Sequence, residues 1–381
     1  MKQIPYILFT CLCCLCLSCK TENKDTKNPV SEEGAPVEIK YASGLSIEKF
    51  TGYKIVTVKN PWPGAEKSYR YLLSEENAKI PDGLEYDQKI KVPVTNIVVT
   101  STTHIPALEI LNEETSLTGF PGLDYISSEK TRKRITKGQV KELGKNEALN
   151  TEILLDLQPD VVIGFSINGS NKSLKTIQKS GIPVVFNADW TENSPLGKAE
   201  WIKFFGAFFG KTDQANAFFE QVENEYLEAR KLARKAEVKP TVLSGAMWKD
   251  QWYLPAGNSW QASFIKDANA DYLFSETNGN GSLSLSLESV LAKAANADFW
   301  VGPAQYTSYE KMKNASPHYA EFDAFKNRRV FTFSSEKGET GGVIFYELAP
   351  NRPDLVLKDL ISIFHPDLQP NYKTTFYKPL E

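Results

Sequence analysis

Cysteine is absent from the body of this 381-residue chain. All five cysteines lie among the first 19 residues, and residues 20–381 contain none. A chain body without cysteine excludes internal disulfides and thiolate metal sites. Histidine is also scarce, because His104, His318 and His365 are the only three. A bare transition-metal site built from thiolates and imidazoles is therefore not expected.

The sequence also lacks the patterns of several large function classes. Its formal net charge is −3 and it has no basic tract, which argues against nucleic acid as a partner. Beyond the first 19 residues, no apolar run approaches the roughly 18 residues that span a bilayer. No phosphate-binding loop, His-x-x-x-His pair or Gly-x-Ser-x-Gly elbow occurs. We therefore expect no catalytic residues and no resident cofactor, in a protein that is not an enzyme.

The first 19 residues have the pattern of an export signal. Lys2 supplies a positive start, residues 4–17 are apolar, and Ser18-Cys19 follow. The segment resembles a bacterial lipoprotein signal, although Cys16 stands where leucine is usual. Two interpretations remain open. Either Cys19 is lipidated and anchors the chain at a membrane surface, or this is an ordinary signal peptide with incidental cysteines.

The remaining chain can be divided by its composition and by its pattern of predicted secondary structure. Residues 20–37 are polar and predict a flexible tether. Residues 38–95 alternate short apolar stretches with Pro-Gly turns, which predicts a β-rich extension. From residue 96 the pattern changes to strand–helix alternation, and this predicts an N-terminal lobe over 96–211 and a C-terminal lobe over 237–381. A long helix is expected between them, over 212–236, because apolar residues recur there at three- and four-residue steps.

The predicted strands indicate the kind of sheet. Residues 160–164 (Asp-Val-Val-Ile-Gly) and 182–186 (Ile-Pro-Val-Val-Phe) are continuously apolar rather than alternating. Such runs are typical of parallel sheets covered by helices on both faces. The two halves also carry a faint repeat, in 149–164 and 285–302. Each copy has a capping residue, a glutamate two positions later, an apolar helix, an aspartate and a strand that ends in glycine.

Several segments together resemble one known family. They are residues 152–163 (Glu-Ile-Leu-Leu-Asp-Leu-Gln-Pro-Asp-Val-Val-Ile), 181–185 (Gly-Ile-Pro-Val-Val), 285–288 with Ala297-Asp298, and 352–368, which begins Arg-Pro-Asp-Leu. This set resembles the class III, or helical-backbone, substrate-binding proteins of ABC importers, the family that binds ferric siderophores and vitamin B12. The resemblance implies an α/β fold with two Rossmann-like lobes and mostly parallel sheets, joined by one long helix. The β-rich extension is additional to the family pattern.

The loops after the predicted strands are rich in aromatic and polar residues. Ligands of open α/β sheets bind at these strand ends. Trp and Tyr offer flat apolar area with a polar edge, which suits a macrocycle or an aromatic chelate. Trp201 and Trp300 instead lie in apolar elements and are expected in the core. The candidate ligand-binding residues are Thr102, His104, Trp190, Trp248, Trp252, Trp260 and Tyr346.

Histidine and glutamate raise separate questions. His104 follows a strand and could face the cleft as a metal or haem ligand, hydrogen-bond a ligand, or serve a structural role. His365 is expected to cap or pack, and His318 to lie at the surface. By resemblance, Glu152 and Glu288 are the docking carboxylates that meet arginine-lined pockets of the permease. They equally suit a first helical turn, where a carboxylate is stabilised by the helix dipole.

The expected function is capture rather than chemistry. The resemblance implies a monomeric lipoprotein on the periplasmic or cell-surface side of a bacterial membrane. It would deliver an iron chelate, haem or cobalamin to an ABC permease dimer. Two alternatives remain: a surface sensor or enzyme that reuses the fold, and a storage lipoprotein without a transporter.

Overall fold

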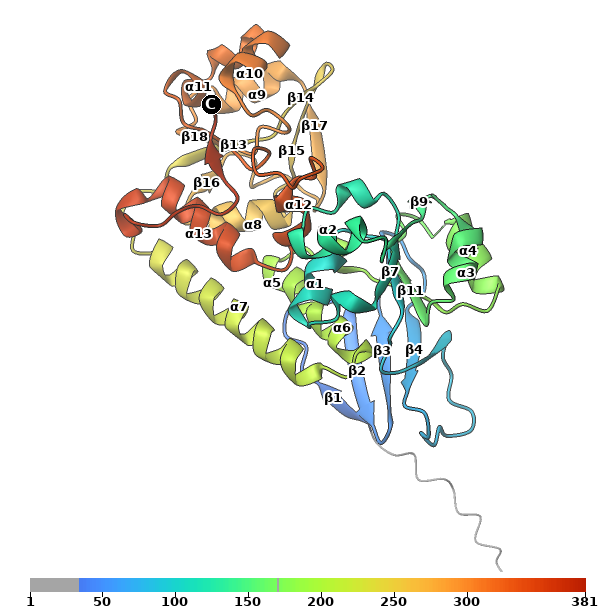
Figure 1. Ribbon diagram of the computed structural model, residues 1–381. Helices are drawn as coiled ribbons and strands as arrows, with labels where there is room; N and C mark the ends of the chain where they lie inside the picture. Colours follow the sequence, from blue (N-terminus) through green and yellow to red (C-terminus); the bar gives the residue numbers. More distant parts are fainter. Residues whose placement is uncertain (1–33, 170) are drawn as a thin grey trace, which may run out of the picture. The chain divides into compact units, whose positions relative to one another are not determined.

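The computed structural model describes residues 34–169 and 171–381. The predicted signal peptide, its candidate lipid-bearing Cys19 and most of the predicted tether lie outside the described residues. Gly34–Glu381 forms one unit, whose elements are labelled in Figure 1.

A five-stranded sheet forms the N-terminal extension. Its order is β1-β2-β3-β4-β5, and only β4 and β5 run parallel. Val56 and Val58 of β3 join the core of the N-terminal lobe, whereas Ile55 faces a smaller cluster on the other side. The predicted tether over 20–37 is too long, because β1 already pairs with β2. The strands are β1 (Ala35–Val37), β2 (Leu45–Phe50), β3 (Tyr53–Val58), β4 (Tyr69–Ser74) and β5 (Gln88–Lys91).

The N-terminal lobe is built on a parallel sheet with the order β12-β11-β6-β7-β8. The central strands β6 and β11 are buried at every position, as their continuous apolar sequences predict. A short hairpin of β9 and β10 lies beyond the sheet. The strands are β6 (Ile97–Val99), β7 (Leu117–Phe120), β8 (Lys141–Glu142), β9 (Gly144–Lys145), β10 (Ala148–Leu149), β11 (Val161–Gly164) and β12 (Val184–Phe186).

Helices cover both faces of this sheet. Val98 and Val162 share a cluster with Leu154 of α3 and Leu174 of α4. Alternate positions of the same strands belong to the larger core with α1 and α6. The helices are α1 (His104–Ile110), α2 (Glu129–Thr136), α3 (Thr151–Leu157), α4 (Lys172–Lys179), α5 (Pro195–Glu200) and α6 (Ile202–Phe208).

The C-terminal lobe repeats this plan. Its main sheet has the order β16-β13-β18-β19-β20, with only β20 antiparallel, and a three-stranded sheet of β14, β15 and β17 lies beside it. The strands are β13 (Thr241–Ser244), β14 (Ala246–Trp248), β15 (Gln251–Pro255), β16 (Asp271–Tyr272), β17 (Ser282–Leu285), β18 (Phe299–Val301), β19 (Val330–Thr332) and β20 (Lys378–Pro379). The helices are α8 (Trp260–Asp267), α9 (Leu287–Ala294), α10 (Tyr309–Ala315), α11 (Asp323–Lys326), α12 (Ile344–Leu348) and α13 (Pro353–Phe364).

One long helix, α7 (Thr212–Ala233), connects the two lobes (Figure 1). Its buried apolar residues recur at steps of three and four and form a single stripe. Phe219 and Val222 pack in the N-terminal core, whereas Tyr226 and Ala229 pack in the C-terminal core. One helix therefore contributes to both hydrophobic cores, which makes it a structural connector rather than a loose linker.

The two lobes share the order of four strands and an aspartate that joins the starts of two of these strands. Four strands of each main sheet have the same relative order, which is β7-β6-β11-β12 in the N-terminal lobe and β16-β13-β18-β19 in the C-terminal lobe. Asp160, just before β11, accepts hydrogen bonds from Thr95 N at 2.8 Å and Thr95 Oγ1 at 3.0 Å. Asp298 accepts the equivalent pair from Thr241, both at 2.8 Å. These carboxylates join the start of β6 to that of β11 and the start of β13 to that of β18, so the aspartate of the sequence repeat has the same structural role in both lobes.

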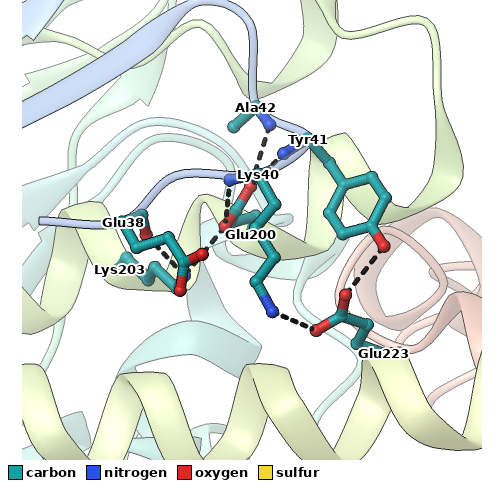
Figure 2. Close-up of polar contacts among 7 residues, drawn as sticks. All are labelled: Glu38, Lys40, Tyr41, Ala42, Glu200, Lys203 and Glu223. Carbon is teal, nitrogen blue, oxygen red and sulfur yellow. Dashed lines mark hydrogen bonds and ion pairs between the residues drawn. The ribbon is translucent and has the colours of Figure 1, made fainter.

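Residues 38–42 fasten the extension to the helices between the lobes (Figure 2). Glu200 accepts hydrogen bonds from the backbone N–H groups of three consecutive residues, Lys40, Tyr41 and Ala42, at 2.6–2.9 Å. Glu223 of α7 accepts from the Tyr41 hydroxyl at 2.7 Å and from Lys40 Nζ at 3.1 Å. The Tyr41 ring packs against both hydrophobic cores. The predicted α/β fold with two lobes, one long helix and a β-rich extension is thus confirmed.

Candidate functional site

A cavity of about 800 Å³, here called the main cavity, lies at the carboxyl ends of the N-terminal sheet. Residues 100–102 follow β6, residues 120–122 end and follow β7, and Phe165 follows β11. The C-terminal lobe contributes Gly342, Val343 and Tyr346. The cavity therefore lies between the lobes, where the strand order of an open α/β sheet places ligands. Tyr125, Glu142 and residues 144–147 complete its wall.

A smaller cavity of about 270 Å³ lies at the strand ends of the C-terminal sheet. Ser244 of β13, Gly302 after β18 and Phe333 after β19 line it. Tyr346 lines both cavities, and its side chain is 53% exposed. The two strand-end sites are therefore adjacent and share one aromatic wall.

The lobes meet directly beside the main cavity. The Glu347 carboxylate of α12 accepts hydrogen bonds from Ser127 N at 2.6 Å and Ser128 N at 2.9 Å, at the start of α2. Burial raises the pKa of Glu347 to about 7, although these two backbone donors act in the opposite direction. A second bond joins Asn351 Nδ2 to the Thr103 carbonyl at 2.9 Å. These contacts set the position of the neighbouring Tyr346 against the N-terminal lobe.

The structure brings three predicted ligand-binding residues to the cavities. Thr102 and Tyr346 line the main cavity, and Trp260 lines the smaller one with Tyr346. The Trp260 ring packs against Phe345 and lies 5.4 Å from Lys198 Nζ. Lys198 itself donates to the carbonyls of Asp189 and Trp190, both at 3.0 Å. The indole is thus held in place from both lobes.

The profile of one family, described as periplasmic binding protein, matches residues 97–336. This chain belongs to that family. The matched range covers most of both lobes and the whole of α7, and it leaves the β-rich extension outside. The predicted resemblance to class III substrate-binding proteins is confirmed.

Individual proteins are similar to this chain in sequence or in fold. An uncharacterized lipoprotein of Methanocaldococcus jannaschii is 29% identical over 385 aligned residues, which cover 95% of this chain and 90% of the relative. The periplasmic heme-binding protein RhuT from Roseiflexus sp. RS-1 has a TM-score of 0.55 at 20% identity, over 72% of this chain and 100% of its own. A protein of an ABC-type Fe3+-hydroxamate transport system from Saccharomonospora viridis has a TM-score of 0.54 at 15% identity, over 72% and 94%. The two solved structures share their fold with this chain.

Two predicted residues of this periplasmic binding protein lie outside both cavity linings. Trp190 lies in a single 3₁₀ turn, Asp189–Thr191, and its side chain is 37% exposed. Trp248 ends β14 and is 69% exposed, on the same face of the hairpin as Tyr253. Tyr253 lines the smaller cavity. A ligand contact for either tryptophan stays a prediction.

Two other predicted ligand-binding residues need correction, because both are fully buried. Trp252 has no exposed surface, donates from Nε1 to the Ser244 carbonyl at 3.1 Å, and packs against Trp300. Successive side chains of a strand point to opposite faces, so Trp252 of β15 points into the core and the next residue, Tyr253, points outward. His104 begins α1 and packs against Phe205 with no exposed surface. Burial lowers the pKa of His104, so the imidazole is a neutral core group rather than a cleft-facing ligand.

The two candidate docking glutamates occupy equivalent positions. Glu152 and Glu288 are each the second residue of a helix, α3 and α9, and both are exposed. The helices are capped by Asn150 and Ser286, whose side chains accept from the backbone N–H three residues later. Hydrogen bonds from its own backbone N–H and from Ser286 hold the pKa of Glu288 below its usual range. The Glu288 carboxylate therefore remains charged, and both side chains are available at the surface.

Sequence reasoning missed several residues of the main cavity. Tyr125, Phe165 and the buried Phe120 line it, together with Thr100 and Asn146. The strand β7 that brings Phe120 and Tyr125 to the cavity is short and contains Gly119, so its apolar pattern is weak. The Pro121-Gly122 pair after this strand was the one sequence signal for a turn at the cavity.

Neither metal-binding clusters nor membrane spans occur in the described parts of the chain. Residues 34–169 and 171–381 contain no group of three or more His, Cys, Asp or Glu side chains placed to hold a metal ion. Over the same ranges, every helix is too short or too polar to cross a bilayer.

Proposed function

We propose that this protein is the substrate-binding component of an ABC importer. It captures an iron-siderophore, corrinoid or haem-type ligand between its lobes. The main cavity carries this proposal, because about 800 Å³ lies within the roughly 300–1,000 Å³ typical of small-molecule sites. Aromatic residues from both lobes line it, so a large flat chelate would contact both lobes at once.

Known relatives support this class of ligand. The similar structures include a heme-binding protein and a component of an Fe3+-hydroxamate transport system. The full-length relative from Methanocaldococcus jannaschii is a lipoprotein. We infer an extracytoplasmic location with a lipid anchor at Cys19, and we assign the protein a role in binding rather than catalysis.

Delivery would use the paired glutamates. Glu152 and Glu288 lie one on each lobe, exposed and in matching helical positions. Charge complementarity with arginine side chains of a permease dimer would orient the loaded protein and speed its encounter. The N-terminal lobe and the C-terminal lobe would then each meet one permease subunit.

A fluorescence titration of residues 20–381 tests the binding step. Cyanocobalamin, several ferric siderophores and haemin are added in turn, and quenching of tryptophan is followed. Trp260 lines the smaller cavity and Trp190 is partly exposed, so both are suitable reporters. We expect saturable quenching by one ligand with a Kd below about 1 µM.

Tyr346→Ala tests the location of that site. Tyr346 lines both cavities, so removing its ring should weaken binding roughly tenfold through lost aromatic contact. Tyr86→Ala is the matched control, because Tyr86 is an exposed tyrosine of the extension that lines neither cavity. Equal affinities of both variants would place the ligand elsewhere.

A further inference from the structure

The long helix α7 passes from one hydrophobic core to the other near its middle. Phe219 and Val222 pack in the N-terminal core, whereas Tyr226, one turn after Val222, packs in the C-terminal core. Glu223 lies between them, at the middle of the helix. A long helix can curve, and hinge motions between domains are absorbed by a few residues that connect them. Residues 222–226 are therefore the hinge of this molecule, where a change of angle between the lobes would be absorbed.

Two side chains of the N-terminal extension bind α7 at this hinge (Figure 2). The Tyr41 hydroxyl donates to Glu223 Oε1 at 2.7 Å, and Lys40 Nζ donates to Glu223 Oε2 at 3.1 Å. Burial and the hydrogen bond to Glu223 raise the pKa of Tyr41 to about 12, so the hydroxyl stays protonated and remains a donor. The Tyr41 ring packs edge-on against Phe219, with 6.0 Å between the ring centres, and it also packs against the C-terminal core. The extension thus contacts α7 at the point where the helix leaves one core for the other.

The same segment of the extension is bound to α5, a second helix that packs in both lobes. Leu196 of α5 belongs to the C-terminal core and Ala199 to the N-terminal core, and α5 contacts α8 and α13. Glu200, the last residue of α5, accepts hydrogen bonds from three successive backbone N–H groups of the segment at 2.6–2.9 Å. Glu192, just before α5, accepts from the next two at 3.2 Å and 2.8 Å. Residues 38–44 are therefore fixed to two helices that each reach both lobes.

From these contacts we propose that residues 38–44 are a brace across the hinge, which holds the two lobes at one angle and keeps the main cavity preformed. Bending of α7 at Glu223 would separate this carboxylate from Tyr41 and Lys40. Because Glu223 is buried, a carboxylate without these donors would be left in a low-dielectric place, which is costly. The lining of each cavity contains no brace residue, so the brace acts on the angle between the lobes rather than on a ligand. This role goes beyond the proposed function and is independent of the identity of the ligand.

The absence of cysteine from residues 20–381 permits a direct measurement of the arrangement of the lobes. Lys175→Cys in α4 and Lys313→Cys in α10 provide one exposed labelling site on each lobe. Spin labels at these two positions give the distribution of distances between the lobes by pulsed EPR, in protein without ligand. We expect one narrow distribution for the parent protein, because an intact brace holds the hinge at one angle.

Lys40→Ala with Tyr41→Ala removes both side chains that bind Glu223. The distance distribution should broaden, and its centre should move by about 2 Å or more, the scale of a domain rearrangement. Lys67→Ala with Tyr69→Ala is the matched control. This lysine is also paired with a carboxylate of the extension, but the tyrosine ring packs against β12 of the N-terminal lobe instead of α7. The control variant should keep the narrow distribution of the parent.

Two results would overturn the brace. One is a parent-like distribution in folded Lys40→Ala/Tyr41→Ala, since α7 and the contacts beside the main cavity would then hold the lobes alone. The other is equal broadening in the control variant, since any weakening of the extension would then have the same effect. Circular dichroism checks folding. If the double alanine variant does not fold, Lys40→Met with Tyr41→Phe replaces it, because this pair removes the bonds to Glu223 and retains the ring, and the same change is expected.

The outcome for the brace is separate from the outcome for the proposed function. Distances are measured without ligand, so a parent protein that binds none of the tested chelates would count against the proposed function and leave the brace standing. A parent protein that binds a chelate, together with a parent-like distribution in the brace variant, would have the opposite meaning.

Discussion

At the scale of single residues, the surroundings of Glu347 strongly raise the pKa of its carboxyl group. It is buried, joins α12 to the start of α2 across the lobes, and lies near the Glu109 carboxylate. Burial comes first among the causes that raise its pKa to about 7, and the charge of Glu109 adds to it. The folded protein therefore binds more protons than the unfolded chain between about pH 4.5 and pH 7.

This protonation predicts a pH-dependent stability. Because the pKa is raised in the folded state, the contribution of Glu347 to stability should fall as pH rises through that window, by up to about 3 kcal/mol. Urea unfolding at pH 5 and pH 8 measures it, and Glu347→Gln should reduce the difference between the two pH values. Glu48→Gln removes an exposed carboxylate of β2 and is the control. An identical pH dependence in the wild type and Glu347→Gln would refute the assignment.

At the scale of secondary-structure elements, the carboxylate of Glu200 connects the extension with the helices between the lobes. Glu200 has no exposed surface and accepts bonds from three backbone N–H groups as well as from Lys203 Nζ at 2.8 Å. Lys203 is also buried and donates to the Glu38 carbonyl at 2.8 Å. The backbone of residues 38–42 is therefore held to the helices by the buried Glu200–Lys203 ion pair (Figure 2).

Removal of this acceptor should be strongly destabilising. Glu200→Ala would leave Lys203 as an uncompensated buried charge, and we expect a loss of about 3–5 kcal/mol in the free energy of unfolding. The double variant with Lys203→Met should recover part of that loss. Glu228→Ala removes an exposed glutamate that pairs with Lys231 on α7 and should cost less than about 1 kcal/mol. Equal losses for Glu200→Ala and Glu228→Ala in denaturant unfolding would contradict this account.

At the scale of the whole molecule, the two lobes are similar in construction and differ in what they offer to a ligand. The same strand order and the same aspartate clamp recur in both. The larger cavity, however, belongs mainly to the N-terminal lobe, and the C-terminal lobe adds Tyr346 and the smaller cavity. Because the two lobes have the same fold but line the cavities with different residues, a ligand between them would contact a different surface on each lobe.

The paired glutamates lead to a prediction for transport. Glu152→Arg combined with Glu288→Arg should leave ligand affinity unchanged, because neither residue lines a cavity. Uptake into cells that carry the cognate permease should fall at least roughly tenfold, since charge complementarity would become repulsion. Glu129→Arg with Glu310→Arg is the control, in which two other exposed first-turn glutamates are reversed. Uptake that falls equally in both double variants would show that the effect is nonspecific.

The sequence by itself determined the order and type of the main elements, because local periodicity and capping depend on residues close in the chain. It also indicated the long helix, the repeat around Glu152 and Glu288, and the aromatic character of the strand-end loops. Only the tertiary structure decided which loop residues face the cavities. Trp252 and Tyr253 are neighbours, yet one is buried and the other is half-exposed. His104, Tyr125 and Glu347 were equally undetermined, because their surroundings come from residues far away in the chain.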